Sequence, residues 1–202
     1  MHATFWDALR RLGAEYGKTR LKGSFISQTL SMHYDYKTLY EKSAAFYHAR
    51  PRAKKALLIS NPVFTWLFFF AYAAFLAWAV FSNVSVYELV YMLALPALCL
   101  VVVGVLRMTV LRPRPYSKEG ANITPILKKE NNLDKSFPSR HVACAFVIST
   151  VVLAHFLWAG IPLFLCAVAL GYIRFALGLH YPSDLLGGAA IGLACGIAAF
   201  FV

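Results

Sequence analysis

Five long hydrophobic segments dominate the sequence after residue 60. They cover residues 62–82, 86–106, 142–158, 161–177 and 184–202, and each is 17 to 21 residues long. At about 1.5 Å per residue, helices of this length approach the ~30 Å of hydrocarbon in a bilayer. Backbone polar groups in lipid must be satisfied within each segment, so helices are the expected conformation. The sequence therefore predicts an all-α fold, a multi-pass transmembrane helical bundle of about five spans.

Composition supports a membrane domain preceded by a different kind of segment. The chain is 59% hydrophobic and 14% charged, with a mean hydropathy of +0.59, whereas soluble domains carry about 25% charged residues. We assign residues 61–202 to the transmembrane domain and residues 1–60, which are polar and basic, to an N-terminal segment. Apolar residues recur there at helical spacing in two stretches: Phe5, Trp6, Leu9 and Leu12, then Leu39, Ala45, Phe46 and Ala49. This spacing predicts amphipathic helices on the membrane surface, with a partly disordered tail as the alternative.

The net charge of +11 comes from two basic blocks, residues 10–55 and 107–140, which flank hydrophobic segments. This placement favours an anionic membrane surface or a phosphorylated substrate over nucleic acid, for which no basic–aromatic stacking motif is present. With five spans, both blocks lie on one side, and the opposite loops 83–85 and 159–160 carry no Lys or Arg. The positive-inside rule then predicts a cell-membrane protein with its N-terminus and polar loop in the cytoplasm.

The cysteines and carboxylates suggest no metal or disulfide. The four cysteines lie singly inside apolar runs, which predicts neither disulfides nor a zinc site. The sequence also offers no carboxylate cluster for a divalent cation, so we expect no cofactor.

A first polar cluster follows the second hydrophobic segment. Arg107, Arg112 and Arg114 lie within eight residues, and Pro113 and Pro115 end the helix and hold the chain extended. Guanidinium groups bind phosphate through paired hydrogen bonds. Taken alone, the cluster also fits an ordinary cytoplasmic basic flank.

A second cluster, Ser136-Phe-Pro-Ser139-Arg140-His141, comes directly before the third hydrophobic segment. A Ser near the N-cap and a His in the first turn would surround free backbone N–H groups, which attract an anion. A capped helix with an interfacial His is the alternative.

The third cluster contains Arg174, His180 and Asp184. Arg174 falls inside the fourth hydrophobic segment, where a charge needs a carboxylate or a bound phosphate as partner. His180 and Asp184 share a helix face if the last helix includes residue 180, and a short turn joins them if it begins near Pro182. An Asp bonded to one ring nitrogen leaves the other free to attack. A purely structural Arg–Asp pair is the alternative.

Together the three clusters resemble the tripartite signature of the type-2 phosphatidic acid phosphatase (PAP2) family, which vanadium haloperoxidases share. That signature reads K-x6-R-P, then P-S-G-H, then S-R-x5-H-x3-D. Arg107 stands where the family has Lys, Arg140 where it has Gly and Ile173 where it has Ser. The similarity covers about residues 86–190. Family members commonly have six spans, and this chain shows an amphipathic N-terminal segment in place of the first.

The resemblance implies a role for each matching residue. His180 would attack phosphorus to form a phosphohistidine, Asp184 would orient it, and His141 would protonate the leaving group and then activate water. The implied phosphate-binding residues are Arg107, Arg114, Ser139, Arg140 and Arg174. No metal is implied, and vanadate or tungstate would mimic the bound phosphate.

We therefore predict a membrane-embedded lipid phosphatase acting on phosphatidic acid, phosphatidylglycerophosphate or a polyprenyl phosphate or diphosphate. A carrier-lipid diphosphatase of the undecaprenyl type with an outward-facing site is the first alternative. A non-catalytic protein that binds anionic lipid, and a vanadate-dependent oxidase, are the remaining ones.

Overall fold

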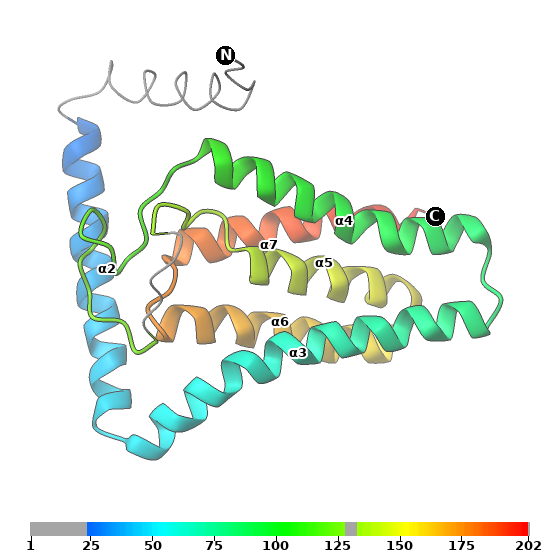
Figure 1. The fold of residues 1–202 in the computed structure, drawn as a ribbon, viewed down its shortest axis with the longest axis horizontal. Coiled ribbons are helices and arrows are strands. Elements are labelled where there is room, and N and C mark those ends of the chain that lie inside the picture. Colours follow the sequence, from blue (N-terminus) through cyan, green and yellow to red (C-terminus); the bar gives the residue numbers. More distant parts are fainter. Residues whose placement is uncertain (1–23, 128–132, 202) are drawn as a thin grey trace, which may run out of the picture.

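Helices make up most of the described part of the chain. The computed structural model describes residues 24–127 and 133–201, so the apolar stretch from Phe5 to Leu12 lies outside it. The helices are α2 (Ser24–His48), α3 (Pro51–Phe81), α4 (Val86–Thr109), α5 (Arg140–His155), α6 (Leu157–Ala176), α7 (Pro182–Gly196) and the short 3-10 helix η1 (Ile197–Phe200). Figure 1 shows α3 to α7 running side by side, with α2 crossing one end of the bundle. The predicted all-α multi-pass fold is confirmed.

Local sequence sets several helix ends. Ser85 and Glu88 form a capping box at the start of α4, in which each side chain accepts the other residue's backbone N–H, at 3.2 and 3.1 Å. Pro51 and Pro182 occupy the first positions of α3 and α7, where a missing N–H costs nothing. The turn between α3 and α4 is short, and these helices form an antiparallel hairpin (Figure 1).

Two predicted boundaries were wrong. The helix expected from residue 62 begins at Pro51, so its 31 residues extend for ~46 Å, beyond the hydrocarbon thickness. The break expected at 159–160 lies at Phe156, which has an extended backbone. At Gly160, which lies where this break was expected, a Cβ would lie 2.3 Å from the Cα of Leu153. This glycine therefore allows close packing of the two helices. The break at Phe156 was missed because hydropathy cannot detect a break within an apolar run.

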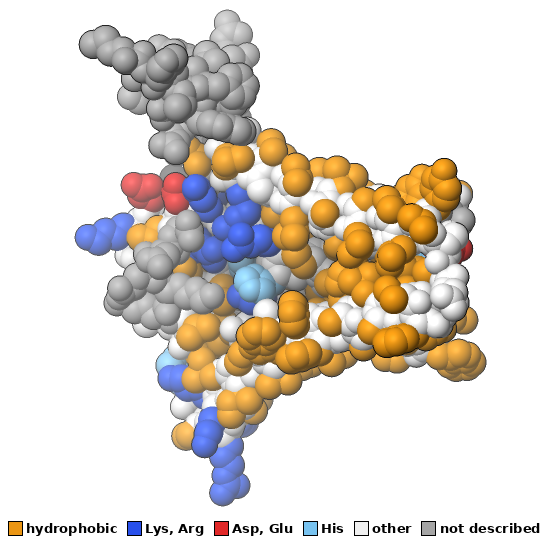
Figure 2. Space-filling model, turned by 45° about the vertical axis from the view of Figure 1, so that its right-hand side comes forward, with side chains coloured by type: hydrophobic (Ala, Val, Ile, Leu, Met, Phe, Trp, Pro, Cys, Tyr) orange, Lys and Arg blue, Asp and Glu red, His pale blue; other side chains and the backbone are white. Residues whose placement is uncertain are grey.

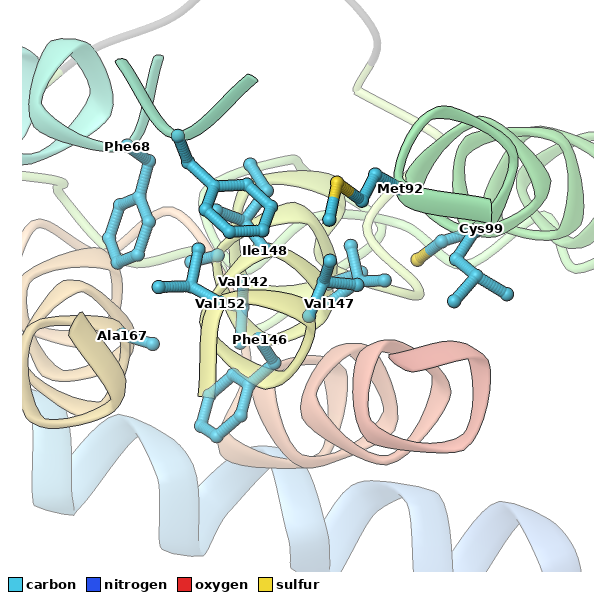
Figure 3. Packing of buried hydrophobic residues seen from close by; sticks show 14 of the residues in the cluster. Phe68, Met92, Cys99, Val142, Phe146, Val147, Ile148, Val152 and Ala167 are labelled. Atoms are coloured by element: carbon cyan, nitrogen blue, oxygen red, sulfur yellow. The ribbon is translucent and has the colours of Figure 1, made fainter. Parts of the chain in front are cut away.

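Helix α5 forms the centre of the bundle. Val142, Ala143 and every residue from 145 to 152 are buried, and Figure 3 shows Phe68 of α3, Met92 of α4 and Ala167 of α6 around it. Four helices, Pro51–Phe81, Val86–Thr109, Leu157–Ala176 and Pro182–Phe200, are long and apolar enough to span a membrane, and α5 is a shorter apolar helix. Because its neighbours shield it from lipid, α5 can be shorter than they are.

The glycine ladder of α7 packs against α5. A Cβ would lie 2.6 Å from the carbonyl oxygen of Ser139 at Gly188, and 2.4 Å from that of Ala143 at Gly192. At Gly196 it would lie 2.6 Å from the Thr150 Cβ. Small residues at this spacing allow close helix approach. The ladder therefore serves packing within one chain.

The molecule has an apolar side and a basic end. Figure 2 shows hydrophobic side chains along the visible bundle, while Lys and Arg gather at the end that α2 crosses. The loop after α4, the turn before α7 and α2 all lie at this end (Figure 1). A multi-pass membrane protein with its basic segments at one end is therefore established.

Helix α2 is joined to this end by its tyrosines. Tyr36 and Tyr40 are buried, and the Tyr36 ring lies edge-on to Tyr181, with centroids 4.7 Å apart. The Tyr40 hydroxyl donates to the Thr124 carbonyl at 3.1 Å and accepts the Ile126 N–H at 3.0 Å. Helix α2 thus holds the loop that follows α4 against the bundle.

Candidate active site

Backbone hydrogen bonds connect the three polar clusters, although they are far apart in the sequence. Ser136 donates its N–H to the carbonyl of Arg112 at 2.9 Å, which joins the first cluster to the second. Ser139 donates its N–H to the carbonyl of Asp184 at 3.0 Å, which joins the second to the third. The clusters therefore form one site at the basic end of the bundle.

Asp184, in the first turn of α7, is the hub of this site and is fully buried. Its Oδ1 accepts a hydrogen bond from Arg112 at 2.7 Å. Its Oδ2 accepts the hydroxyl of Ser136 and the N–H of Tyr181, the latter at 3.0 Å. The Nδ1 of His180 lies 3.6 Å from the same Oδ2, slightly beyond hydrogen-bond length. Paired and bonded in this way, a carboxylate can remain charged in the interior.

His180 lies in the turn between α6 and α7 with 3% of its surface exposed. Since α7 begins at Pro182, a short turn rather than a helix face brings His180 to Asp184, the second of the two arrangements predicted. Burial lowers the pKa of His180 to about 4, while Asp184 acts in the opposite direction. The resting imidazole is therefore neutral at physiological pH, as a nucleophile requires.

Arg174 enters the site from the last turn of α6 and is 3% exposed. Its Nη2 lies 3.5 Å from the Thr65 hydroxyl, and its Nε has no hydrogen-bond partner. No carboxylate of the described residues forms an ion pair with it. The buried hydroxyl of Ser139, at the N-cap of α5, also has no partner. A buried cation and a buried hydroxyl are thus left with unused donors.

Two further guanidinium groups are held by backbone carbonyls. Arg107 donates to Pro138 at 2.8 Å and to Lys135, and Arg114 donates to Leu179 at 3.1 Å. Carbonyl oxygens fix the direction of a guanidinium without neutralising its charge. These two arginines therefore bring both orientation and positive charge to the site.

Electrostatic interactions show that the predicted residues converge. Arg114 acts on both Arg174 and His180, and Arg107 interacts with Arg114 and Arg140. The structure thus brings the cations and the imidazole predicted from all three clusters to one place. Such an arrangement can bind an anion and stabilise the negative charge that develops around phosphorus during transfer.

Arg140 and His141, the first residues of α5, line an apolar groove beside this site. Arg140 is exposed and His141 is half-buried. The groove has a volume of ≈ 360 Å³, and its other lining residues come from α3, α4, α5 and α6: Thr65, Phe68, Phe69, Leu100, Cys144, Ala145, Ile148 and Leu170. An apolar space therefore adjoins a cationic one.

Ile173 lies outside the polar site, whereas Arg112 and Ser136 belong to it although the sequence did not single them out. Ile173, at the position of the family's Ser, packs in an apolar cluster with Leu57 and Leu177 and is 6% exposed. Arg112 and Ser136 were not predicted as site residues, yet both bond directly to Asp184. Their positions inside the first two clusters could have marked them as site residues. Their partner Asp184, however, lies 72 residues from Arg112 and 48 residues from Ser136, so the sequence does not show the pairing.

The described residues provide no cluster of metal-binding side chains at this site. Among residues 24–127 and 133–201, no group of three or more His, Cys, Asp or Glu side chains is placed to hold an ion. The four cysteines are free.

Comparisons with known proteins agree with this geometry. The family model of the PAP2 superfamily matches residues 85–202, which include all three clusters. The chain is 37% identical over 91 residues to lipid A 4'-phosphatase of Bacteroides thetaiotaomicron, covering 43% of this chain and 40% of that protein. It is 36% identical over 67 residues to undecaprenyl-diphosphatase BcrC of Bacillus subtilis, covering 33% of this chain and 35% of that protein. The chain thus spans about two fifths or less of the curated relatives that it matches.

A solved structure extends the similarity. The crystal structure of Aquifex aeolicus LpxE superposes with a TM-score of 0.50 at 26% identity, covering 73% of this chain and 94% of that one. The helical bundle that carries the site is therefore shared with it.

Proposed function

The chain belongs to the PAP2 superfamily, and on that premise we propose that it is a membrane-embedded lipid phosphatase that works through a phosphohistidine intermediate. The observation that carries the proposal is the buried, unneutralised Arg174 beside a neutral, buried His180. A buried charge in this position costs free energy unless an anion pairs with it. A phosphate group has the charge and the acceptor oxygens to do so.

In the first step, His180 attacks phosphorus through Nε2, because its Nδ1 faces Asp184. The new P–N bond forms as the bond from phosphorus to the lipid oxygen breaks, and a protonated His141 gives its proton to the leaving alkoxide. Asp184 stabilises the positive charge that develops on the His180 ring.

In the second step, His141 takes a proton from water, which attacks phosphorus and breaks the P–N bond. Inorganic phosphate leaves, and His180 returns to its neutral form. Through both steps the phosphate oxygens would be held by cationic and hydroxyl donors: Arg107, Arg114, Ser139, Arg140 and Arg174. These donors are fixed in advance, which lowers the cost of stabilising the transition state.

The groove next to Arg140 and His141 supports a lipid as the substrate. Its lining is apolar and comes from four helices of the membrane bundle. A lipid phosphate could enter the cationic site while its hydrocarbon chain stays in this groove. Phosphatidic acid, phosphatidylglycerophosphate and polyprenyl phosphates or diphosphates all have this form.

The basic end of the bundle, with α2 and the active site, faces the cytoplasm in this proposal because it carries the excess of Lys and Arg. The outward-facing alternative, a diphosphatase of carrier lipids, draws on the match to undecaprenyl-diphosphatase BcrC. Replacing Lys118, an exposed residue of the loop after α4, with Cys in a cysteine-free background separates the two. Labelling of intact cells by a membrane-impermeant reagent would overturn the cytoplasmic orientation.

The central experiment measures phosphate release from a panel of these lipid phosphates in detergent, for the wild type and His180→Ala. We expect release by the wild type, a loss of at least about 10³-fold in the variant, and retained binding of anionic lipid vesicles by both. If the two proteins release phosphate equally, His180 is not the nucleophile and the proposed mechanism fails. If neither releases phosphate while both bind the vesicles, the chain is a lipid-binding protein and the proposal fails.

Vanadate gives a second test that does not need the substrate. Because no described carboxylate pairs with the buried Arg174, we expect vanadate, tungstate and phosphate to raise the melting temperature of the purified protein. Chloride at equal ionic strength serves as the control. No shift with any of the three oxyanions would count against the anion site.

A further inference from the structure

Arg112 differs from the other arginines of the site in its partners. Its Nη1 donates to Oδ1 of Asp184 at 2.7 Å and to the hydroxyl of Ser183 at 2.8 Å. Its guanidinium also lies over the ring of Tyr181, 4.4 Å from the centroid. A planar guanidinium held by hydrogen bonds and an aromatic face has little freedom to move.

The family signature uses the arginines that flank this residue, at positions 107 and 114, and leaves Arg112 as an unassigned x residue. Arg112 belongs to the same extended segment, yet its bonds lead to a carboxylate and not to the unneutralised part of the site. Its charge is thus already matched by Asp184. It is therefore poorly suited to bind phosphate.

Asp184 needs such a partner. Its carboxylate is fully buried, and its Oδ2 is shared among the Ser136 hydroxyl, the Tyr181 N–H and the nearby His180 ring. With Oδ1 held by Arg112, the plane of the carboxylate is fixed and Oδ2 faces His180. If that hold were removed, the carboxylate would rotate or take up a proton, since an unpaired buried charge is costly.

We propose that Arg112 is a positioning residue of the phosphatase reaction, which acts on His180 only through Asp184 by holding the carboxylate charged and correctly turned. This inference rests on the proposed function. It assigns the two neighbouring arginines of one segment to different tasks: Arg114 toward the phosphate, and Arg112 toward the residue that orients the nucleophile.

The test is a double-mutant cycle on phosphate release, with Arg112→Met, Asp184→Asn and the combined variant. We expect Arg112→Met to lower kcat by roughly 100-fold, with KM and the inhibition constant for vanadate within about threefold of wild type. The combined variant should be no slower than Asp184→Asn alone, because Arg112 has no route to the reaction other than Asp184. Arg112→Lys should recover part of the loss, since it keeps the charge.

Two controls separate this role from a general loss of structure. Lys118→Met removes a cation from the same loop at an exposed position and should leave kcat unchanged. Stabilisation of Arg112→Met by vanadate shows that its anion site is still folded. Losing that stabilisation, or a rise in KM with unchanged kcat, would make Arg112 a phosphate ligand or a structural residue and overturn the proposal.

The remaining outcomes are equally decisive. Multiplicative losses in the combined variant would show that Arg112 acts independently of Asp184, and would also overturn the proposal. Phosphate release by the wild type but not by His180→Ala supports the lipid phosphatase function whatever the Arg112 variants do. A wild type inactive on every lipid phosphate removes both proposals together.

Discussion

Replacing Gly188 with Ala should damage catalysis far more than stability. A Cβ at this position would lie 2.6 Å from the carbonyl oxygen of Ser139 and 3.4 Å from the N of Ala143. The oxygen belongs to the backbone, so it cannot rotate away. An ordinary contact needs about 3.4 Å, and the start of α5 must therefore move by about 0.8 Å from α7. The same two helices carry the hydrogen bond from Ser139 to Asp184.

The expected magnitudes follow from these contacts. Overpacking costs about 1–3 kcal/mol, and the better helix propensity of Ala returns up to about 1 kcal/mol, so the net loss of stability is ~0–2 kcal/mol. A displacement approaching 1 Å among reacting groups can cost as much as ~100-fold in rate. We therefore expect a 10- to 100-fold lower kcat for Gly188→Ala, at a melting temperature only a few degrees below that of wild type.

Gly196→Ala is the matched control. Gly196 lies on the same face of α7, eight residues and ~12 Å beyond Gly188. A Cβ at Gly196 would lie 2.6 Å from the Thr150 side chain. It should lose similar stability and keep kcat near wild type. Gly104→Ala in α4, where a Cβ has no neighbour within 4 Å, should keep kcat and should not lower the melting temperature. Equal losses of kcat in Gly188→Ala and Gly196→Ala would refute the idea that this part of the ladder positions the site.

Three other outcomes follow from the structure. Arg174→Met removes a buried charge that the Thr65 hydroxyl, 3.5 Å away, does not neutralise. The melting temperature without ligand should therefore not fall, while stabilisation by vanadate should disappear. A large drop without ligand would contradict this. The pKa of His180 is 6.5 in the unfolded chain and about 4 in the folded protein, where the ring is buried. Between pH 6.5 and pH 4 the unfolded chain therefore binds a proton that the folded protein does not. The free energy of unfolding should fall by at most ~3 kcal/mol as the pH decreases across this range. In a pH series of melting temperatures, His180→Gln should flatten that decline, and an unchanged slope would show that His180 is not its source. Tyr40→Phe leaves the Ile126 N–H without its partner and should cost about 1–3 kcal/mol, measured by thermal unfolding, and a neutral effect would mean that α2 does not secure the loop.

Sequence alone determined the helices and the composition of the site. Each hydrophobic segment predicts its own conformation, because backbone groups in lipid must be satisfied locally. The spacing of Gly188, Gly192 and Gly196 is typical of close helix packing, and the contacts with α5 agree. The three polar clusters, each at the end of a segment, identified the residues that meet at one end of the bundle.

Only the tertiary structure decided which of these residues pair. A carboxylate at position 184 could have paired with Arg174, ten residues earlier, but it pairs with Arg112, 72 residues away. No carboxylate among the described residues pairs with Arg174, and this difference separates the proposed anion site from a structural ion pair. Likewise, hydropathy could not place the break at Phe156, since apolar residues flank it on both sides. Pairings and breaks of this kind depend on distances between helices, which a pattern along the chain does not contain.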